Sequence, residues 1–250
     1  MYPIPAPSAQ GDGPGGHSYG AIIAPDGEDA SARVDRVLRD IRFSGWIAPP
    51  ADGVIVVVGD PGDGVVADDR RGIIEVAGQL AAVIRGPVLA VRVRGDRQLA
   101  LVAWSSAEEV VRYCSDPSRE PGADPEVLTD PIGAEGAGVL ADLWHRPDAE
   151  EKLGELLEEE LDPDSVNESE RLGIVLRLLG LPTWIVSAGA LPRAMPRGPA
   201  VSELTRLRAG ATGIAGRSRD AALGPLRKRQ QPPPVIEDPP TGMAPEPWMF

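Results

Sequence analysis

Hydrophobic residues gather in three neighbouring segments near the middle of the chain. Residues 88–94 and 98–104 are rich in β-branched and aliphatic side chains, and they flank the Gly-Asp pair at 95–96. Glycine at the first central position favours a two-residue type II′ turn, so the pattern predicts a β-hairpin. A third apolar run, residues 109–113, follows the polar break at 105–107. We therefore predict a three-stranded meander.

A continuous apolar strand and an amphipathic helix precede this meander. Val54 to Val58 is a run of valine and isoleucine between two glycines, which is typical of a strand covered on both faces. Residues 69–84 have apolar positions at helical spacing, and Gly86-Pro87 ends the pattern. Strand, helix and strand in this order predict a crossover connection. Further upstream, residues 30–41 predict a helix and residues 43–47 a short strand.

Helical periodicity dominates the second half of the chain. Residues 133–144, 147–161 and 168–179 each place leucine and valine on one side, and the middle one carries glutamate on the other. Residues 184–187 predict a short strand, and residues 200–207 predict one or two helical turns. The fold class expected from all these elements is α/β (α+β): a mixed sheet with a central meander and helices packed on it.

The meander resembles a pattern found in a group of uncharacterised bacterial proteins. The residues that carry the resemblance are Gly95 to Trp104, Glu108 to Pro117 with its Tyr-Cys-Ser-Asp-Pro ending, and the later Leu-Gly-Leu-Pro element at 179–182. The resemblance implies a strand, not a helix, at residues 108–113. This chain departs from the pattern at Arg97, where the group has an acidic residue. The group has no established activity, so the resemblance implies no function.

Composition separates the two ends from the middle. The chain has 29 glycines and 27 prolines in 250 residues, and many of them lie near the termini. Segments of this kind bury too little apolar surface to offset the entropy of ordering the backbone. We therefore expect disordered tails at residues 1–30 and 209–250, and a single α/β domain at residues 31–208.

Charge and hydropathy limit the partners of the chain. A net charge of −13 argues against nucleic acid or an anionic membrane as the main partner, because phosphate binding requires clustered positive charge. The basic cluster at 227–229 is too small to change this. Residues 172–191 are the most apolar stretch, but Arg177 and Pro182 favour a helix followed by a strand over a membrane span. With no secretory signal in the sequence, the expected location is the cytoplasm.

Few residues offer metal, cofactor or nucleophile chemistry. The single cysteine, Cys114, ends a predicted strand and is expected to be a buried apolar group. His17 and His145 lie far apart in the sequence, so we predict no metal site. The Gly-rich loop at 59–64 lacks the Gly-Lys-Ser/Thr ending of a phosphate loop and contains two aspartates, so we predict no nucleotide cofactor.

Three function classes remain, and one of them is a peripheral membrane protein anchored through residues 172–191. The expected function is a non-catalytic intracellular protein-interaction module, because Trp248, Met249 and Phe250 place large apolar groups at the chain end, where a partner's pocket could bury them. The acidic helix at 147–161 is a second candidate contact. The alternative is a carboxylate-dependent hydrolase in which Asp96, Glu108 and Asp116 gather at the strand ends.

Overall fold

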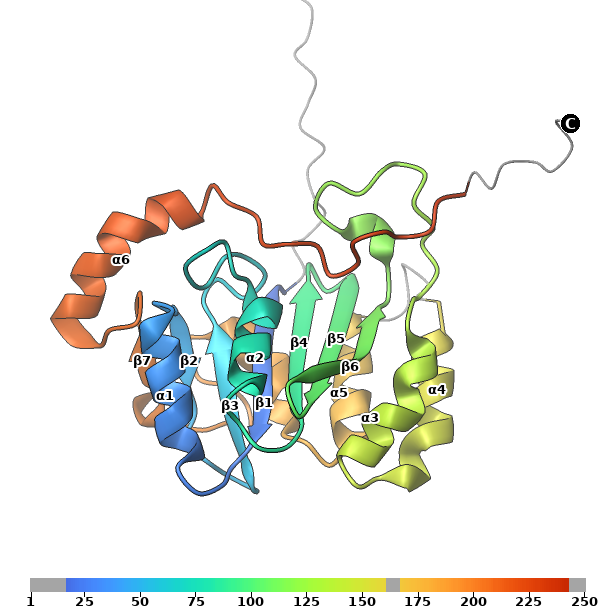
Figure 1. Ribbon diagram of the computed structural model, residues 1–250, viewed down its shortest axis with the longest axis horizontal. Coiled ribbons are helices and arrows are strands. Elements are labelled where there is room, and N and C mark those ends of the chain that lie inside the picture. Colours follow the sequence, from blue (N-terminus) through green and yellow to red (C-terminus); the bar gives the residue numbers. More distant parts are fainter. Residues whose placement is uncertain (1–16, 161–166, 243–250) are drawn as a thin grey trace, which may run out of the picture.

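The computed structural model describes residues 17–160 and 167–242, and a seven-stranded sheet lies at its centre (Figure 1). The strand order is β6-β5-β4-β1-β3-β2-β7, and every neighbouring pair is antiparallel. The strands are β1 (Tyr19–Pro25), β2 (Gly45–Ile47), β3 (Val54–Gly59), β4 (Val88–Arg94), β5 (Gln98–Ser105), β6 (Glu108–Cys114) and β7 (Thr205–Leu207). The mixed α/β fold and its meander are thus confirmed.

Two interlocked crossover units form the first half of the sheet. Helix α1 (Ala30–Asp40) connects β1 to β2, and α2 (Ile73–Ala81) connects β3 to β4. Each unit joins two parallel strands with one strand of the other unit between them. This β-α-β-β-α-β arrangement is the split, ferredoxin-like topology. The predicted crossover is present, but β1 lies between β3 and β4, so these two parallel strands are not direct neighbours in the sheet.

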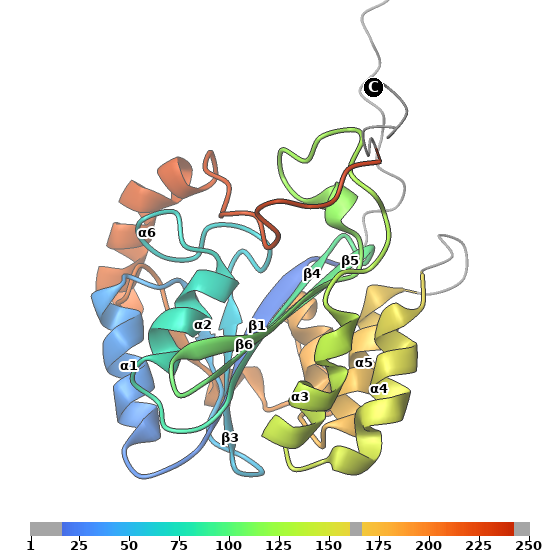
Figure 2. The same cartoon turned by 45° about the vertical axis from the view of Figure 1, so that its right-hand side comes forward.

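Helices cover both faces of the sheet (Figure 2). One face packs against α1 and α2, and the other against α3 (Ala137–Leu143), α4 (Glu150–Glu158), α5 (Glu168–Leu178) and the 3-10 segment η4 (Thr183–Ala190). Side chains of β1 alternate between these two cores: Ala21 and Ile23 lie in one, Ile22 and Ala24 in the other. The sheet is therefore buried on both sides.

Several local predictions need correction. Gly95 and Asp96 both have positive φ, of 55° and 56°, as in a type I′ turn and unlike the predicted type II′. Helix α2 begins only at Ile73, because the positive φ values of Asp69 and Arg70 interrupt helical geometry before it. The predicted strand at 184–187 is part of η4, and residues 205–207 of the predicted helical turns form strand β7.

The predicted amino-terminal tail was wrong for residues 19–25, which form β1. This strand lies between β4 and β3, and its residues from Tyr19 to Ala24 are buried. Only two of them, Ile22 and Ile23, are large aliphatic residues, so the strand has a weak sequence signal next to the glycine-rich start. Gly20 is required here, because a Cβ at this position would lie 2.4 Å from the Gly62 carbonyl oxygen.

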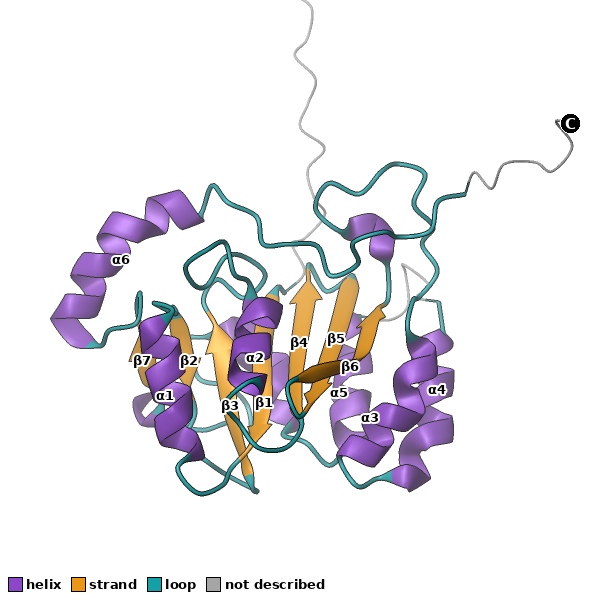
Figure 3. Cartoon of the chain, in the orientation of Figure 1, coloured by secondary structure: helices purple, strands orange, loops and turns teal. Residues whose placement is uncertain are grey.

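The predicted carboxyl-terminal tail was also wrong for much of its length. Residues 213–227 form helix α6, and the segment that follows it is an extended loop across one end of the sheet (Figure 3). We call residues 231–242 the strap. Thr241 in the strap forms a β-bridge with Val127, and Arg70 donates hydrogen bonds to the Gln231 carbonyl. The strap is therefore fixed at both of its ends.

The apolar stretch at 172–191 lies within the fold. It forms most of α5 and all of η4, and its buried residues pack in the core beneath the sheet. Among residues 17–160 and 167–242, no helix combines the length and apolarity needed to cross a bilayer.

Candidate functional site

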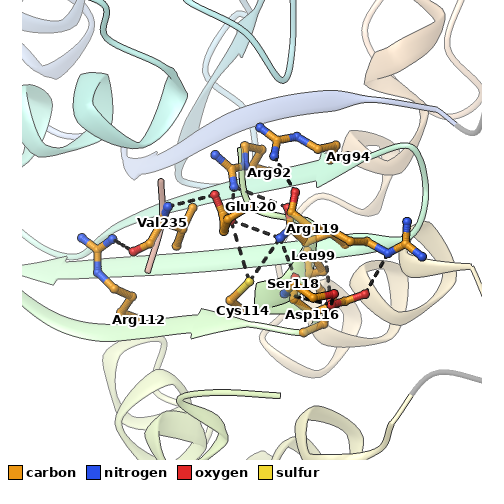
Figure 4. Close-up of polar contacts among 12 residues, drawn as sticks. Arg92, Arg94, Leu99, Arg112, Cys114, Asp116, Ser118, Arg119, Glu120 and Val235 are labelled. Carbon is orange, nitrogen blue, oxygen red and sulfur yellow. Dashed lines mark hydrogen bonds and ion pairs between the residues drawn. The ribbon is translucent and has the colours of Figure 1, made fainter. Parts of the chain in front are cut away.

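A buried polar cluster lies where β4, β5 and β6 approach the strap (Figure 4). Arg92, Gln98 and Cys114 come from these three strands, and each is at most 3% exposed. In the sheet register Arg92 lies beside Ala100, which lies beside Cys114, so the strands place these side chains on the face that α2 covers. We call this cluster, together with Glu120, the strap site.

Glu120 connects the polar residues of the strands to the strap. It follows the short 3-10 turn η1 (Pro117–Arg119), and the residue is 5% exposed. Its Oε1 atom lies 2.5 Å from Arg92 Nη2 and accepts a hydrogen bond from Gln98 Nε2 at 3.1 Å. Its Oε2 atom accepts a hydrogen bond from the Val235 amide at 3.1 Å. One carboxylate therefore joins β4, β5 and the strap.

The strap closes this site. Val235 is 1% exposed and belongs to the apolar core beneath it. Its carbonyl accepts a hydrogen bond from Arg112, which also forms an ion pair with Glu109 at 2.5 Å. The strap is thus held by both backbone groups of Val235.

The electrostatics of the strap site are typical of a structural network. Burial, reinforced by the neighbouring Glu120 carboxylate, raises the pKa of Cys114 to about 12, so its thiol stays protonated at neutral pH. The Arg92 Nε atom is buried and has no hydrogen-bond partner among the described residues. A protonated thiol is a poor nucleophile, and the ion pair between Arg92 and Glu120 is buried. The strap site is therefore better suited to holding the strap in place than to reacting with a substrate.

A hollow of about 290 Å³ lies between the strap and the loop of residues 120–127. Its lining includes the carboxylates of Glu120, Asp124, Glu237 and Asp238 and no cationic side chain of the described residues. Carboxylates repel anions, so this hollow is a poor site for a phosphate or a nucleotide.

A second buried cluster lies on the other face of the sheet, around Glu168 at the start of α5. Glu168 is 0% exposed, and Arg171 is its closest charged partner, with 3.6 Å between Arg171 Nε and Glu168 Oε2. Arg171 also donates a 2.7 Å hydrogen bond to the Tyr113 hydroxyl. Neither Glu168 carboxylate oxygen has a hydrogen-bond partner among the described residues.

Burial raises the pKa of Glu168. The positive charge of the Arg171 guanidinium lowers it in part, while the nearby Asp96 and Asp116 carboxylates raise it further. Burial likewise raises the pKa of Tyr113. The cluster is therefore a buried group of ionisable side chains that is less completely hydrogen-bonded than the strap site.

The three predicted carboxylates do not converge. Asp96 lies in the β4–β5 turn, where its Oδ1 atom accepts a 2.8 Å hydrogen bond from the Ser169 amide. Asp116 lies at the same end of the sheet and caps η1 by accepting from the Ser118 amide. Glu108 starts β6 at the opposite end of β5, so it cannot share a site with them. Each of these two aspartates is explained by a structural hydrogen bond: Asp116 caps its own turn, and Asp96 joins the β4–β5 turn to the start of α5.

Sequence reasoning missed Arg92, Gln98, Glu120 and Glu168. Arg92 and Gln98 did carry a signal, because each is a polar residue within a strand predicted to be buried. Glu120 and Glu168 lie at a loop and a helix start, where acidic residues are usually exposed. The structure describes no cluster of three or more metal-ligating side chains among residues 17–160 and 167–242. Trp248, Met249 and Phe250 lie outside the described residues.

Comparison with other proteins gives no family for this chain: no protein-family model, curated protein or solved structure matches it significantly.

Proposed function

We propose that this chain is a non-catalytic, cytoplasmic protein-interaction module, in which the sheet is a scaffold that presents surface elements to a partner protein. The observation that carries this proposal is the high solvent exposure of helix α6. Of its 15 residues, only Gly216 and Arg227 are buried, and Ile214 and Leu226 are 76% and 59% exposed. A helix of this length is only marginally stable in water without packing, so contact with a partner would stabilise it.

The buried polar groups are consistent with a scaffold role. The strap site uses its charges to hold the strap, and the Glu168 cluster lies inside the core. The carboxylate-hydrolase alternative requires Asp96, Glu108 and Asp116 in one accessible cleft, and Glu108 lies at the far end of β5. The chain end at Trp248–Phe250 stays a predicted contact in addition to α6.

A photo-crosslinking side chain in place of Ile214 tests this proposal in the cells that the chain comes from. We expect a covalent adduct with one reproducible protein, identified by mass spectrometry, because position 214 is exposed on α6. The same side chain in place of Val83, which is 38% exposed after α2, is the matched control and should give no such adduct. Equal labelling from both positions, or no adduct from position 214, would contradict the proposal.

A further inference from the structure

Helix α6 and the residues after it form a basic surface on an acidic chain. Four exposed cationic side chains lie here, whereas the whole chain has a net charge of −13. They are Arg217, Arg219, Lys228 and Arg229. Asp220 is the one acidic residue of the helix, and it is half-buried. The surface therefore differs in sign from most of the molecule.

Only one stripe of α6 faces the rest of the protein. Its members recur at helical spacing: Gly216, Asp220, Leu223, Gly224 and Arg227 are the buried or half-buried positions. Arg227 fixes the end of the helix by donating to Ser44 Oγ at 3.0 Å and Asp68 Oδ1 at 2.9 Å. The backbone of Gly216 approaches Ala211 so closely that a Cβ would lie 2.4 Å from its carbonyl oxygen.

The opposite stripe of α6 is exposed and has no charged side chain. It consists of Ile214, Ser218, Ala221 and Pro225, again at helical spacing. Glycines and Pro225 weaken the helix intrinsically, by about 1 kcal/mol for each interior glycine and about 3 kcal/mol for an interior proline. A helix with this composition and an exposed apolar stripe gains stability if a second surface covers it.

The most acidic helical surface of the described chain is α4 with its flanking residues. Seven acidic residues are exposed between positions 148 and 160, and Lys152 is the single cation among them. They are Asp148, Glu150, Glu151, Glu155, Glu158, Glu159 and Glu160. Leu153 and Leu157 pack inward, so the carboxylates form the outer face. This face is complementary in charge to α6.

The two surfaces cannot meet within one molecule. Helix α6 lies beyond the β7 edge of the sheet, and α4 lies beyond the β6 edge at the other end (Figure 1). Building on the proposed function, we infer that the partner of α6 is a second copy of this chain, with α6 of one copy docked on α4 of the other. Complementary charges steer such an encounter and fix its register.

The net charge of the chain makes this contact weak and dependent on salt. Two copies repel each other overall, whereas the facing helices attract at short range. At about 0.1 M salt the Debye length of about 10 Å already screens much of the repulsion between whole molecules, whereas charges in direct contact still attract. At about 1 M salt the Debye length is about 3 Å, and this attraction is screened as well. Self-association is therefore expected at low salt and should weaken by about tenfold or more at high salt.

A charge swap tests the inference by sedimentation equilibrium of the full chain. One variant is R217E/R219E on α6, and the other is E155R/E158R on α4; all four residues are exposed, so folding should be unaffected and circular dichroism verifies this. Each variant alone should associate about tenfold more weakly than wild type or worse. An equal mixture should recover association, because the reversed α6 then faces the reversed α4.

A matched control changes the same charge elsewhere: R85E/R97E reverses two exposed arginines outside α6 and should associate like wild type. Wild type that stays monomeric at low salt, or a mixture that does not recover association, would overturn the inference. The proposed function would survive that result if the side chain at position 214 still crosslinked to a different protein. Without any adduct, both would fail.

Discussion

The glutamates at positions 120 and 168 are both buried, but their surroundings differ. Glu120 accepts hydrogen bonds from Gln98 and Val235 and pairs with Arg92 at 2.5 Å. The Glu168 carboxylate has an ion pair at 3.6 Å and no hydrogen bond from a described residue. A buried charge is tolerated only when its partners replace the lost water. The partners of Glu120 therefore replace the water that its carboxylate loses, whereas Glu168 is better accommodated when protonated.

This difference predicts how stability depends on pH. Burial raises the pKa of Glu168 above its ordinary value of 4.5, so the folded chain holds this proton more tightly than the unfolded chain. As pH rises above 4.5, the unfolded chain loses the proton first, and the contribution of Glu168 to the free energy of unfolding falls. The fall ends once the folded chain has ionised as well. Its slope cannot exceed about 1.4 kcal/mol per pH unit for one proton.

Urea denaturation of wild type and E168Q over about pH 4 to pH 8 measures this effect. The free energy of unfolding of wild type minus that of E168Q should fall as pH rises through the raised pKa. The variant E155Q, which changes an exposed glutamate of α4, is the control and should follow wild type. Parallel curves for wild type and E168Q would show that Glu168 binds its proton equally well in the folded and unfolded chain.

At the scale of elements, the sequence predicted the helices and strands whose apolar residues recur at regular spacing and form a buried face. Strands β4 to β6 and helices α1 and α5 lie where their apolar patterns indicated. Strand β1 and helix α6 were missed for different reasons. The small residues of β1 become a strand only because β3 and β4 flank it, and α6 has a composition typical of a linker. In both cases the information lies in distant residues and not in local periodicity.

The strap was missed for a related reason. Its fixed conformation depends on Glu120 and Arg112, which lie more than 100 positions earlier in the sequence. A proline-rich segment can thus be ordered through its backbone groups, although its own side chains predict no regular structure. The same long-range contacts bring Val235 to Glu120 and so complete the strap site. The sequence alone therefore could not predict which residues form this site.

The reactivity of the Cys114 thiol measures whether the strap covers the strap site. It is 0% exposed, and its sulfur lies beneath Glu120, whose other carboxylate oxygen binds Val235. A chain that stops after Gln231 loses this cover. Its thiol should react with an aromatic disulfide reagent about tenfold faster or more than in the full chain, corresponding to about 1.4 kcal/mol of lost protection.

A chain that stops after Gly242 keeps the whole strap and is the matched control; its thiol should react like that of the full chain. Far-ultraviolet circular dichroism shows whether the shortened chain is still folded. Slow reaction in a folded chain that ends at Gln231 would mean that the strap does not protect the strap site.

At the scale of the whole molecule, the fold is a split β-α-β-β-α-β unit extended at both edges. The meander adds β5 and β6 at one edge, and β7 lies at the other. The sequence predicted the crossover and the meander, because each is local in the chain. It did not predict that β1 separates β3 from β4, since that placement depends on contacts between residues far apart. The extensions also place acidic α4 and basic α6 at opposite ends.

Helix α6 contacts the rest of the fold along one stripe only, and contact with a partner surface stabilises it. Amide hydrogen exchange of wild type at low salt, followed from dilute to concentrated solution, tests this stabilisation most directly. In dilute solution the amides of α6 should exchange far faster than those of β1 and β4, which are buried in the sheet. As concentration rises, α6 and α4 should gain protection together. Protection of α6 equal to that of β1 in the monomer, or no gain on concentration, would contradict the claim.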